Sequence, residues 1–232
     1  MKNIKGVYVF FLGLLLGSCA QEKEPWIALF DGKSLDNWEI RNGTAPYKIV
    51  GSEIVGTTKF GSPNTFLCTK ERYGDFILEF EVKVDSSINS GVQFRSLSLP
   101  EYQNGRVHGY QAEIDPSDRA WSGGIYDEGR RGWLYDLKNH PKGKKAFKKN
   151  TWNRYRIEAI GSHISIWING INTSNIMDSM TDRGFIGLQV HSIENAKDIG
   201  KEIRWRNLRI ITDQPEKYAL KADATLKIIS FK

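Results

Sequence analysis

The chain has 232 residues, of which 40% are hydrophobic and 26% are charged, and its formal net charge is +6. These proportions are ordinary for a soluble globular protein with a substantial core. Its 22 glycines and its 27 Trp, Tyr and Phe residues favour turns and strands and argue against a mainly helical protein.

The N-terminal segment has the features of an export signal. Two lysines precede the apolar run 7–16, which is too short to span a bilayer comfortably. The run ends in Leu-Gly-Ser-Cys, which resembles the lipobox of bacterial lipoproteins, where the signal is removed and the cysteine is lipidated. We therefore predict a signal peptide over 1–18, a lipid on Cys19 and a polar tether over 19–25. This makes the protein an exported one, anchored by lipid to a bacterial membrane on its periplasmic or cell-surface side. An ordinary signal peptide with a chance cysteine is the alternative.

Removal of the signal changes the charge and the thiol chemistry. Without Lys2 and Lys5 the mature chain has 31 basic and 27 acidic residues, a net charge of +4. Lipidation of Cys19 would leave Cys68 as the single thiol, so that no disulfide could form within the chain and the core must supply stability. Cys68 stands in an apolar run and is expected to be a small buried hydrophobe rather than a nucleophile.

Nearly every segment that follows resembles a β-strand. Alternation, or a hairpin turn between two runs, marks the segments 47–50, 53–57, 76–84, 90–96, 154–159, 163–168, 184–191 and 202–211. The clearest is 76–84, with five apolar residues on one face and Glu79, Glu81 and Lys83 on the other. No amphipathic helix of useful length is found. Alternating strands with tight turns predict an all-β sandwich of two antiparallel sheets over residues 26–212.

The segment 109–116 has one apolar face and one face of reactive polar groups. Tyr110, Ala112 and Ile114 alternate with Gln111, Glu113 and Asp115. Two other strands carry polar groups of the same kind on their outward faces. The seven residues that would converge if the three strands share a sheet are Gln93, Arg95, Gln111, Glu113, Asp115, Gln189 and His191. Amides, carboxylates and a guanidinium suit the hydroxyls of a sugar, so we predict a carbohydrate-binding groove.

The glycine-bracketed run 121–129 predicts a short strand that enters a turn. We expect this region to add substrate contacts from Trp121, Tyr126, Asp127, Glu128 and Arg131. Aromatic planes suit the C–H faces of sugars. The competing interpretation is a plain turn for 126–128 and core positions for Trp121 and Trp133.

The excess positive charge is concentrated between residues 138 and 149, which include six lysines and no acidic residue. Such a run could bind nucleic acid or anionic glycans. It contains proline and glycine and joins two strand candidates, so a solvated loop is the preferred interpretation. We expect no nucleic-acid partner, because an exported lipoprotein rarely meets one.

Six sequence blocks together resemble one known family. The opening motif over 29–38 (Leu-Phe-Asp-Gly-Lys-Ser-Leu-Asp-Asn-Trp) is similar to the hallmark of the 3-keto-disaccharide hydrolase family. The other blocks, in the order of that family, are 90–96, 109–115, 122–128, Trp152-Asn153 and 184–191. The resemblance runs from about Trp26 to about Ile211 and implies a concanavalin A-like jelly-roll β-sandwich of an exported lipoprotein. Asn37 replaces the usual glycine, and the tail 213–232 extends past the family's usual end, where it could add an edge strand.

The family name implies cleavage of a glycosidic bond next to an oxidised carbon. A ketone at C3 acidifies the hydrogen on C2, so a base can remove it and the C1 leaving group can depart; water can then add back. Glu113 or His191 would be the base, and Asp115 the acid or the partner that orients it. Arg95, Gln93 and Gln111 would hold the C3 oxygen. No cofactor is certain, although a divalent metal on Glu113, Asp115 or His191 would also serve as a Lewis acid.

Two other functions stay open. Glu113 and Asp115 are two residues apart on a strand, so their Cβ atoms would be about 7 Å apart, and they could act as the carboxylate pair of a glycoside hydrolase on unoxidised sugar. The same fold also serves lectins, so the chain could be a carbohydrate-binding surface lipoprotein that performs no chemistry.

Overall fold

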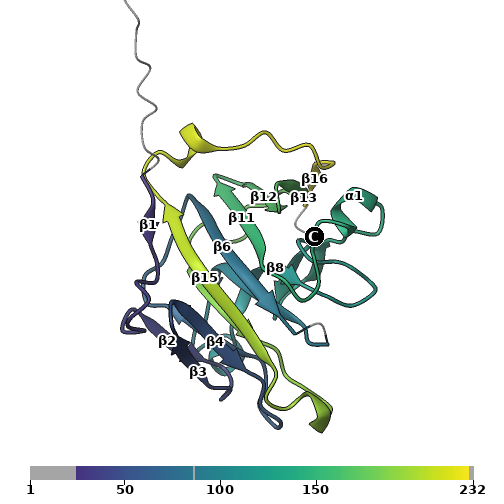
Figure 1. The fold of residues 1–232 in the computed structure, drawn as a ribbon. Helices are drawn as coiled ribbons and strands as arrows, with labels where there is room; N and C mark the ends of the chain where they lie inside the picture. Colours follow the sequence, from purple (N-terminus) through teal and green to yellow (C-terminus); the bar gives the residue numbers. More distant parts are fainter. Residues whose placement is uncertain (1–24, 86, 230–232) are drawn as a thin grey trace, which may run out of the picture.

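The computed structural model describes residues 25–85 and 87–229 (Figure 1). The predicted signal peptide, Cys19 and the tether as far as residue 24 lie outside the described residues, so export and lipidation stay predictions. In the part of the chain that the structure describes, no helix is both long enough and apolar enough to cross a membrane.

The described residues form two stacked sheets, as the alternation predicts. The nine-stranded sheet has the order β16-β13-β12-β11-β6-β15-β4-β3, with β1 paired to β15, and the seven-stranded sheet has the order β10-β9-β8-β7-β14-β5-β2. The strands are β1 (Ile27–Ala28), β2 (Trp38–Arg41), β3 (Tyr47–Val50), β4 (Glu53–Thr57), β5 (Thr65–Thr69), β6 (Phe76–Val84), β7 (Ser90–Leu97), β8 (His108–Ile114), β9 (Ile125–Glu128), β10 (Gly132–Tyr135), β11 (Asn153–Ile160), β12 (His163–Ile168), β13 (Ile171–Met177), β14 (Phe185–Val190), β15 (Glu202–Ile211) and β16 (Lys227–Ile228). The helical segments are α1 (Pro141–Lys144), η1 (Gln103–Gly105), η2 (Ala196–Asp198) and η3 (Pro215–Tyr218). Within the described residues, all strand pairings are antiparallel except that of β13 with β16, which confirms a sandwich of the jelly-roll type.

The core lies between the sheets, where the apolar faces of the alternating strands meet. On β6 the side chains of Phe76, Leu78 and Phe80 are at most 1% exposed. Phe76 meets Phe94 of β7 edge to face, with 6.5 Å between ring centroids, and so joins the two sheets. Each such buried side chain contributes about 1.5–3 kcal/mol to folding. The predicted inward face of β8, with Tyr110 as its largest member, is likewise buried.

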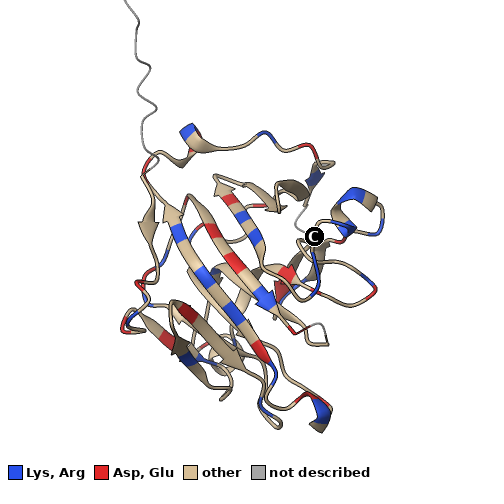
Figure 2. Cartoon of the chain, in the orientation of Figure 1, with Lys and Arg blue, Asp and Glu red and all other residues tan. Residues whose placement is uncertain are grey.

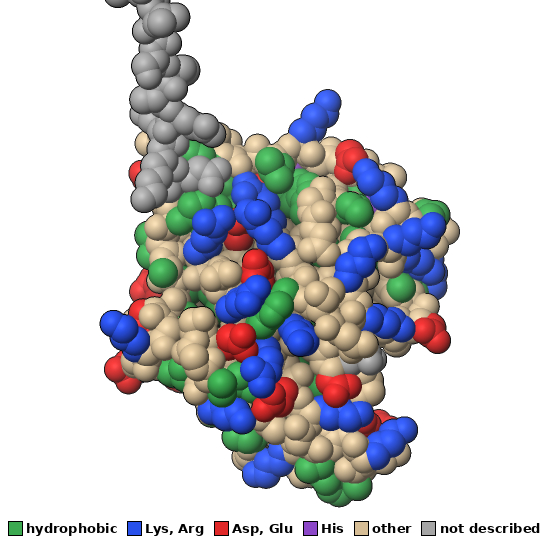
Figure 3. Space-filling view, in the orientation of Figure 1, with side chains coloured by type: hydrophobic (Ala, Val, Ile, Leu, Met, Phe, Trp, Pro, Cys, Tyr) green, Lys and Arg blue, Asp and Glu red, His purple; other side chains and the backbone are tan. Residues whose placement is uncertain are grey.

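The outer face of the nine-stranded sheet is covered by paired charges. Figure 2 shows red segments of β6 lying between blue segments of β11 and β15, so that acidic and basic residues are neighbours across the strands. Glu79 is bound by Arg154, Arg156 and Arg209 at 2.6, 3.1 and 2.6 Å. Burial would raise the pKa of Glu79, but these three hydrogen-bonded arginines together hold it below its usual value. The charges that Figure 3 shows on this face therefore largely neutralise one another.

Arg95 does not lie on the polar face of β7, where the alternation places it. A β-bulge interrupts the β7–β8 pairing between Phe94 and Leu97, and Arg95 has a φ of 44°. The bulge turns its side chain toward the nine-stranded sheet, where it donates to the carbonyls of Gly74, Gly161 and Ala159 and pairs with Asp75. At 1% exposure this guanidinium cannot reach a ligand in the groove, so its predicted role is corrected from substrate binding to structure.

The C-terminal tail crosses over the sandwich to the far edge of the nine-stranded sheet (Figure 1). Arg156 donates to the carbonyl of Tyr218, and the backbone N–H of Ala224 donates to Asn172 of β13. The tail then pairs with β13 as the short parallel strand β16, with Ile176 opposite Lys227. Lys227 finally donates to the carbonyl of Leu134 in β10, so the tail connects the two sheets.

Candidate active site

A polar cleft of about 340 Å³ lies on the outer face of the seven-stranded sheet. Its lining residues are Asn64, Asn89, Arg106, Gln111, Glu113, Arg119, Tyr126, Glu128, Trp133, Gln189 and His191. Six of these were predicted from the sequence: Gln111, Glu113, Tyr126, Glu128, Gln189 and His191.

The strand register explains why these six share one face. Residues directly opposite each other in an antiparallel pair point to the same side of the sheet. Gln111 is opposite Gln93 on one side and Tyr126 on the other, and Tyr126 is opposite Trp133. The alternation along β8 and β9 then adds Glu113 and Glu128.

Glycines leave the space that these side chains occupy. Gly91 is opposite Glu113 in the register. A Cβ at Gly91 would lie 2.4 Å from Cδ of Gln111, and a Cβ at Gly187 would lie 3.3 Å from Cβ of Gln93. The floor of the cleft therefore needs glycine at position 91 for lack of room, rather than for backbone freedom.

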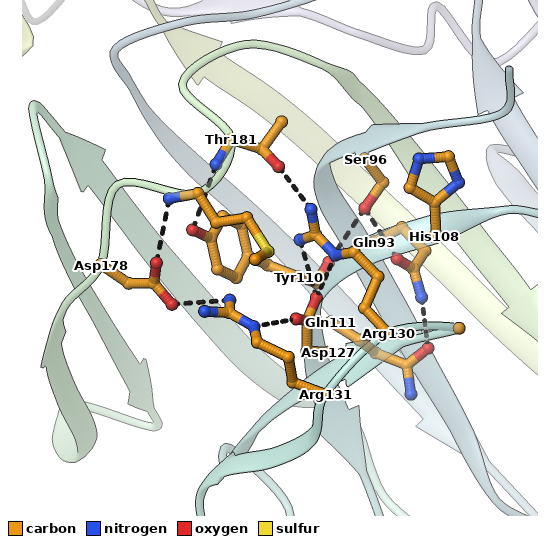
Figure 4. A network of polar contacts seen from close by, with 12 residues as sticks. Gln93, Ser96, His108, Tyr110, Gln111, Asp127, Arg130, Arg131, Asp178 and Thr181 are labelled. Carbon is orange, nitrogen blue, oxygen red and sulfur yellow. Dashed lines mark hydrogen bonds and ion pairs between the residues drawn. The ribbon is translucent and has the colours of Figure 1, made fainter. Parts of the chain in front are cut away.

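Glu113 stands at one end of a chain of side-chain amides. Asn89 donates to its Oε1 at 2.6 Å, and Gln111 donates to its Oε2 at 3.0 Å. Gln93 in turn donates to Gln111 at 2.6 Å, and Ser96 donates to Gln93 at 2.7 Å (Figure 4). Burial raises the pKa of Glu113 to about 7, and the hydrogen bonds from Asn89 and Gln111 limit that rise. Glu113 can thus hold or release a proton near neutral pH.

Glu128 and His191 add a carboxyl group and an imidazole to the cleft. Burial raises the pKa of Glu128, although Arg106, whose Nη2 lies 3.5 Å from its Oε1, counteracts the rise. His191 places Nδ1 2.7 Å from the carbonyl of Ser192. Since a carbonyl only accepts, Nδ1 carries the proton and a neutral ring keeps Nε2 as an acceptor.

Gln189 is the lining residue that most directly indicates a ligand. Its side chain is fully buried, yet neither its Nε2 nor its Oε1 has a hydrogen-bond partner among the described residues. An unpaired buried amide costs about 1–3 kcal/mol. A hydroxyl group in the cleft, which can donate and accept, would satisfy both atoms.

Arg119 and two tryptophans form one wall. The Arg119 guanidinium lies 4.5 Å from the ring centre of Trp121 and 5.1 Å from that of Trp133. Its Nε donates to Asp115 at 2.8 Å. Trp133 lines the cleft. Trp121, which was predicted as a substrate contact, does not line it and packs against Trp133 and Arg119 instead.

Asp115, predicted as a catalytic acid, does not line the cleft. It follows the last residue of β8, and its carboxylate accepts from the backbone of Ser117 and from Arg119. Burial would raise its pKa, but these hydrogen bonds hold the pKa below its usual value. A carboxylate held ionised is a poor acid, so its role is corrected to orienting Arg119.

Asp127 and Arg131 also lie elsewhere. Asp127 is opposite Tyr110 in the register, so it points to the core side of the sheet. There Arg130 and Arg131 bind its carboxylate at 2.8 and 2.5 Å, and Arg131 also binds Asp178 at 2.7 Å (Figure 4). This network ties β9 to the loop after β13, and neither residue can contact a ligand in the cleft.

The residues proposed as metal ligands do not come together. Among the described residues there is no group of three or more His, Cys, Asp and Glu side chains arranged to hold an ion. Asp115 is already neutralised by Arg119, and Glu113 already accepts two amide donors. The Glu113, Asp115 and His191 set therefore does not fit a metal.

Four lining residues were missed by the sequence interpretation: Asn64, Asn89, Arg106 and Arg119. All lie in loops, where alternation gives no direction. The sequence offered one signal for Arg119, because an aspartate, Asp115, stands four residues before it and the two form an ion pair.

The thiol of Cys68 is buried with Phe66 and Phe185, as the sequence predicts.

Comparison with known proteins places the chain in a family. The family model described as the 3-keto-alpha-glucoside-1,2-lyase-like domain matches residues 25–211, which include every residue that lines the cleft. A search of curated protein sequences finds no significant match.

Solved structures share the fold. A candidate glycosyl hydrolase from Parabacteroides distasonis ATCC 8503 has a TM-score of 0.58 at 16% identity, covering 81% of this chain and 93% of the other. The carbohydrate-binding module CBM66 from Bacillus subtilis has a TM-score of 0.54 at 18% identity, covering 74% and 93%. A galectin-like protein of unknown function from the same species has a TM-score of 0.56 at 12% identity, covering 77% and 90%. At these identities the likeness shows the fold alone.

Proposed function

We propose, from the premise that this chain belongs to the family of 3-keto-alpha-glucoside-1,2-lyase-like domains, that it cleaves the glycosidic bond of 3-keto-glycosides in the polar cleft. The observation that carries the proposal is Glu113, a carboxyl group with a pKa of about 7 that lines the cleft. A base is most effective when its pKa lies near the working pH.

The proposed reaction begins at C2 of the oxidised sugar. The Glu113 carboxylate takes the C2 proton, and the electron pair of the C–H bond forms the C2–C3 double bond while the C3 carbonyl oxygen becomes an enolate. The enolate then collapses, a C1–C2 double bond forms, and the bond between C1 and the leaving oxygen breaks. That oxygen leaves with a proton from an acid in the cleft, and water can later add across the new double bond.

The remaining lining residues match the needs of this reaction. Glu128 keeps a proton to higher pH than an ordinary carboxyl, because burial raises its pKa, and we assign it as the acid. Arg106, the other arginine that lines the cleft, provides a cation for the enolate oxygen. Gln189 and the acceptor Nε2 of His191 are suited to sugar hydroxyls, and Trp133 offers an aromatic plane to a ring face.

The geometry does not favour the simple carboxylate pair. Asp115 stays ionised and bound to Arg119, so Glu113 and Asp115 do not form the acid and nucleophile of a glycoside hydrolase. A binding protein without chemistry is the remaining alternative, and a pure binding site has no need of a carboxyl with a pKa near 7.

The test is turnover by the Glu113→Gln variant. 3-Keto-disaccharides and the unoxidised disaccharides are offered, with and without divalent metal, and binding is measured by calorimetry. We expect turnover of the 3-keto substrates to fall about 10²–10⁴-fold while binding persists. Glu81→Gln, on the outer face of the other sheet, should leave turnover unchanged. If the wild type releases no product from any of these substrates, the protein is not this enzyme.

We also propose that the enzyme works at a bacterial envelope. The lipobox-like Leu-Gly-Ser-Cys ending at Cys19 supports export and lipid anchoring. Incorporation of labelled palmitate into the expressed chain, and its loss in Cys19→Ala, would test this placement.

A further inference from the structure

The two ends of the lysine-rich segment 138–149 lie near Trp121 and Arg119, at the wall of the cleft. The segment has six lysines and no acidic residue, and Figure 2 shows blue segments along α1 and the loop next to it. Three of the lysines have acidic partners, at 3.9 Å for Lys138, 3.4 Å for Lys142 and 3.1 Å for Lys149. The other three have none among the described residues, so the segment keeps a positive potential.

Two lysines connect this segment to the wall of the cleft. Lys138 places its Nζ 5.5 Å from the ring centre of Trp121, the same ring that carries Arg119 at 4.5 Å. Lys149 binds Asp118, the residue before Arg119. Both lysines are well exposed, at 66% and 49%. We call Arg119, Lys138 and Lys149 the cationic edge of the cleft. Each of the three has one aspartate partner, so the surplus positive charge next to this edge comes from the unpaired lysines of the same segment.

Arg119 has capacity left for a ligand. Its Nε is used by Asp115, which fixes the plane of the guanidinium. Neither Nη1 nor Nη2 has a hydrogen-bond partner in the described part of the chain, and the side chain is 44% exposed. Two adjacent N–H groups on a fixed plane match a carboxylate or a sulfate. The unpaired, fully buried amide of Gln189 independently indicates a polar ligand in the same cleft.

We infer that the substrate is an acidic glycan, whose carboxylate or sulfate group binds Arg119 while the neighbouring charged units lie along Lys138 and Lys149. The inference rests on the proposed function and narrows its substrate class. An acidic glycan fits better than an anionic membrane surface because the cationic edge continues into the cleft through Arg119. Two lysines on the cleft rim would also attract such a substrate at long range.

The test is binding, measured without turnover. The full chain is titrated with maltotetraose, tetragalacturonic acid and a tetrasaccharide from κ-carrageenan, which are neutral, carboxylated and sulfated. We expect one of the acidic probes to bind about tenfold more tightly than the neutral one. The advantage should vanish between about 10 mM and 1 M salt, where the screening length falls from about 30 Å to about 3 Å. The better of the two acidic probes identifies the anionic group.

Charge reversal locates the effect. Lys138→Glu combined with Lys149→Glu should remove the preference for the acidic probe and leave maltotetraose binding unchanged. The matched control is Lys217→Glu combined with Lys221→Glu in the C-terminal tail, which should change neither. Equal binding of neutral and acidic probes by the wild type, or equal loss in both double variants, would overturn the inference. The inference would also be overturned if the chain bound phosphatidylglycerol vesicles through these lysines and did not bind the acidic oligosaccharides. Turnover of a neutral 3-keto-glycoside without any acidic preference would refute the inference and leave the proposed function intact.

Discussion

Two opposing influences set the pKa of Glu113. Burial favours its protonated form, whereas the amide groups of Asn89 and Gln111 donate to its oxygens and favour the ionised form. The result is a pKa of about 7. The base must be ionised to act. We therefore expect kcat/KM to be low in acid, to rise with a midpoint near pH 7 and to level off above it.

Asn89→Ala removes one of the two donors to Glu113. The ionised form loses stabilisation, so the pKa of Glu113 should rise and the rising limb of kcat/KM should move up by about one pH unit. The measurement is a pH–rate profile on a 3-keto-glycoside. Ser117→Ala, which removes a side-chain hydrogen bond to Asp115 but leaves both donors to Glu113 in place, should leave the limb in place. A limb that moves down, or does not move, speaks against Glu113 as the base.

Glu113 also makes stability depend on pH. Its pKa is about 7 in the folded chain, whereas the pKa of an ordinary glutamate is 4.5. The folded state therefore holds the proton more tightly, and this contribution to stability is fully present below about pH 4.5 and lost as the pH rises to about 7. Glu113→Gln has no such loss, so its unfolding free energy relative to the wild type should increase by about 3 kcal/mol between pH 4.5 and pH 8. Urea unfolding at both pH values measures this, and a difference that is independent of pH would contradict the raised pKa.

At the scale of the strand, alternation predicted well wherever the pairing is regular. It placed Gln111 and Glu113 together on β8, and the same rule separates Tyr126 and Glu128 from Asp127 on β9. Asp127 was misplaced because three consecutive residues of a strand were assigned to one site, although their side chains must point to alternate faces.

Alternation failed where the strand is irregular or has ended. Arg95 lies within a bulge, where one extra residue reverses the direction of the side chain. Asp115 lies just past the end of β8, where its direction is set by local hydrogen bonds. The loop residues Asn89 and Arg119 depend on long-range folding, and their positions cannot be obtained from a periodic pattern.

Gly91→Ala tests the space within the cleft floor. The added Cβ would lie 2.4 Å from Cδ of Gln111, so Gln111 must move and its bonds to Gln93 and Glu113 should break. We expect a large loss of turnover with a stability cost of about 1–3 kcal/mol. Gly74→Ala is the control, because its Cβ would meet nothing closer than 3.8 Å. Normal turnover in Gly91→Ala would mean that the amide chain to Glu113 is not needed.

At the scale of the whole molecule, Arg95 holds the two sheets together at one end of the sandwich. Its four partners, on Gly74, Asp75, Ala159 and Gly161, belong to segments that border β6, β11 and β12 of the nine-stranded sheet. Arg95→Met leaves buried carbonyls without donors and should lower the unfolding free energy by about 3 kcal/mol. Urea unfolding measures the loss, and the pH–rate profile should keep its midpoint. An unchanged stability, or a displaced midpoint, would restore a role for Arg95 in the site.

The two outer faces of the sandwich differ in how their polar groups are used. On the nine-stranded sheet they bind one another, as Glu79 and its three arginines show. On the seven-stranded sheet, the amide of Gln189 and the terminal nitrogens of Arg119 have no hydrogen-bond partner among the residues that the structure describes. The alternation of polar and apolar residues could not distinguish the two outer faces, because the strands of both sheets follow the same pattern. The pairing of strands decides which polar residues neutralise one another.

The fate of a deuterium label at C2 tests the central proposal most directly. A 3-keto-disaccharide deuterated at C2 of the oxidised ring is converted by the wild type in ordinary water, and the product is analysed by mass spectrometry, with the Glu113→Gln variant and enzyme-free buffer as controls for spontaneous exchange. Elimination must break the C2–D bond, so the product should have lost the label, at a rate that depends on Glu113. Full retention of deuterium at C2, together with the absence of a primary deuterium isotope effect on kcat/KM, would show that the glycosidic bond is hydrolysed directly and would contradict proton abstraction by Glu113.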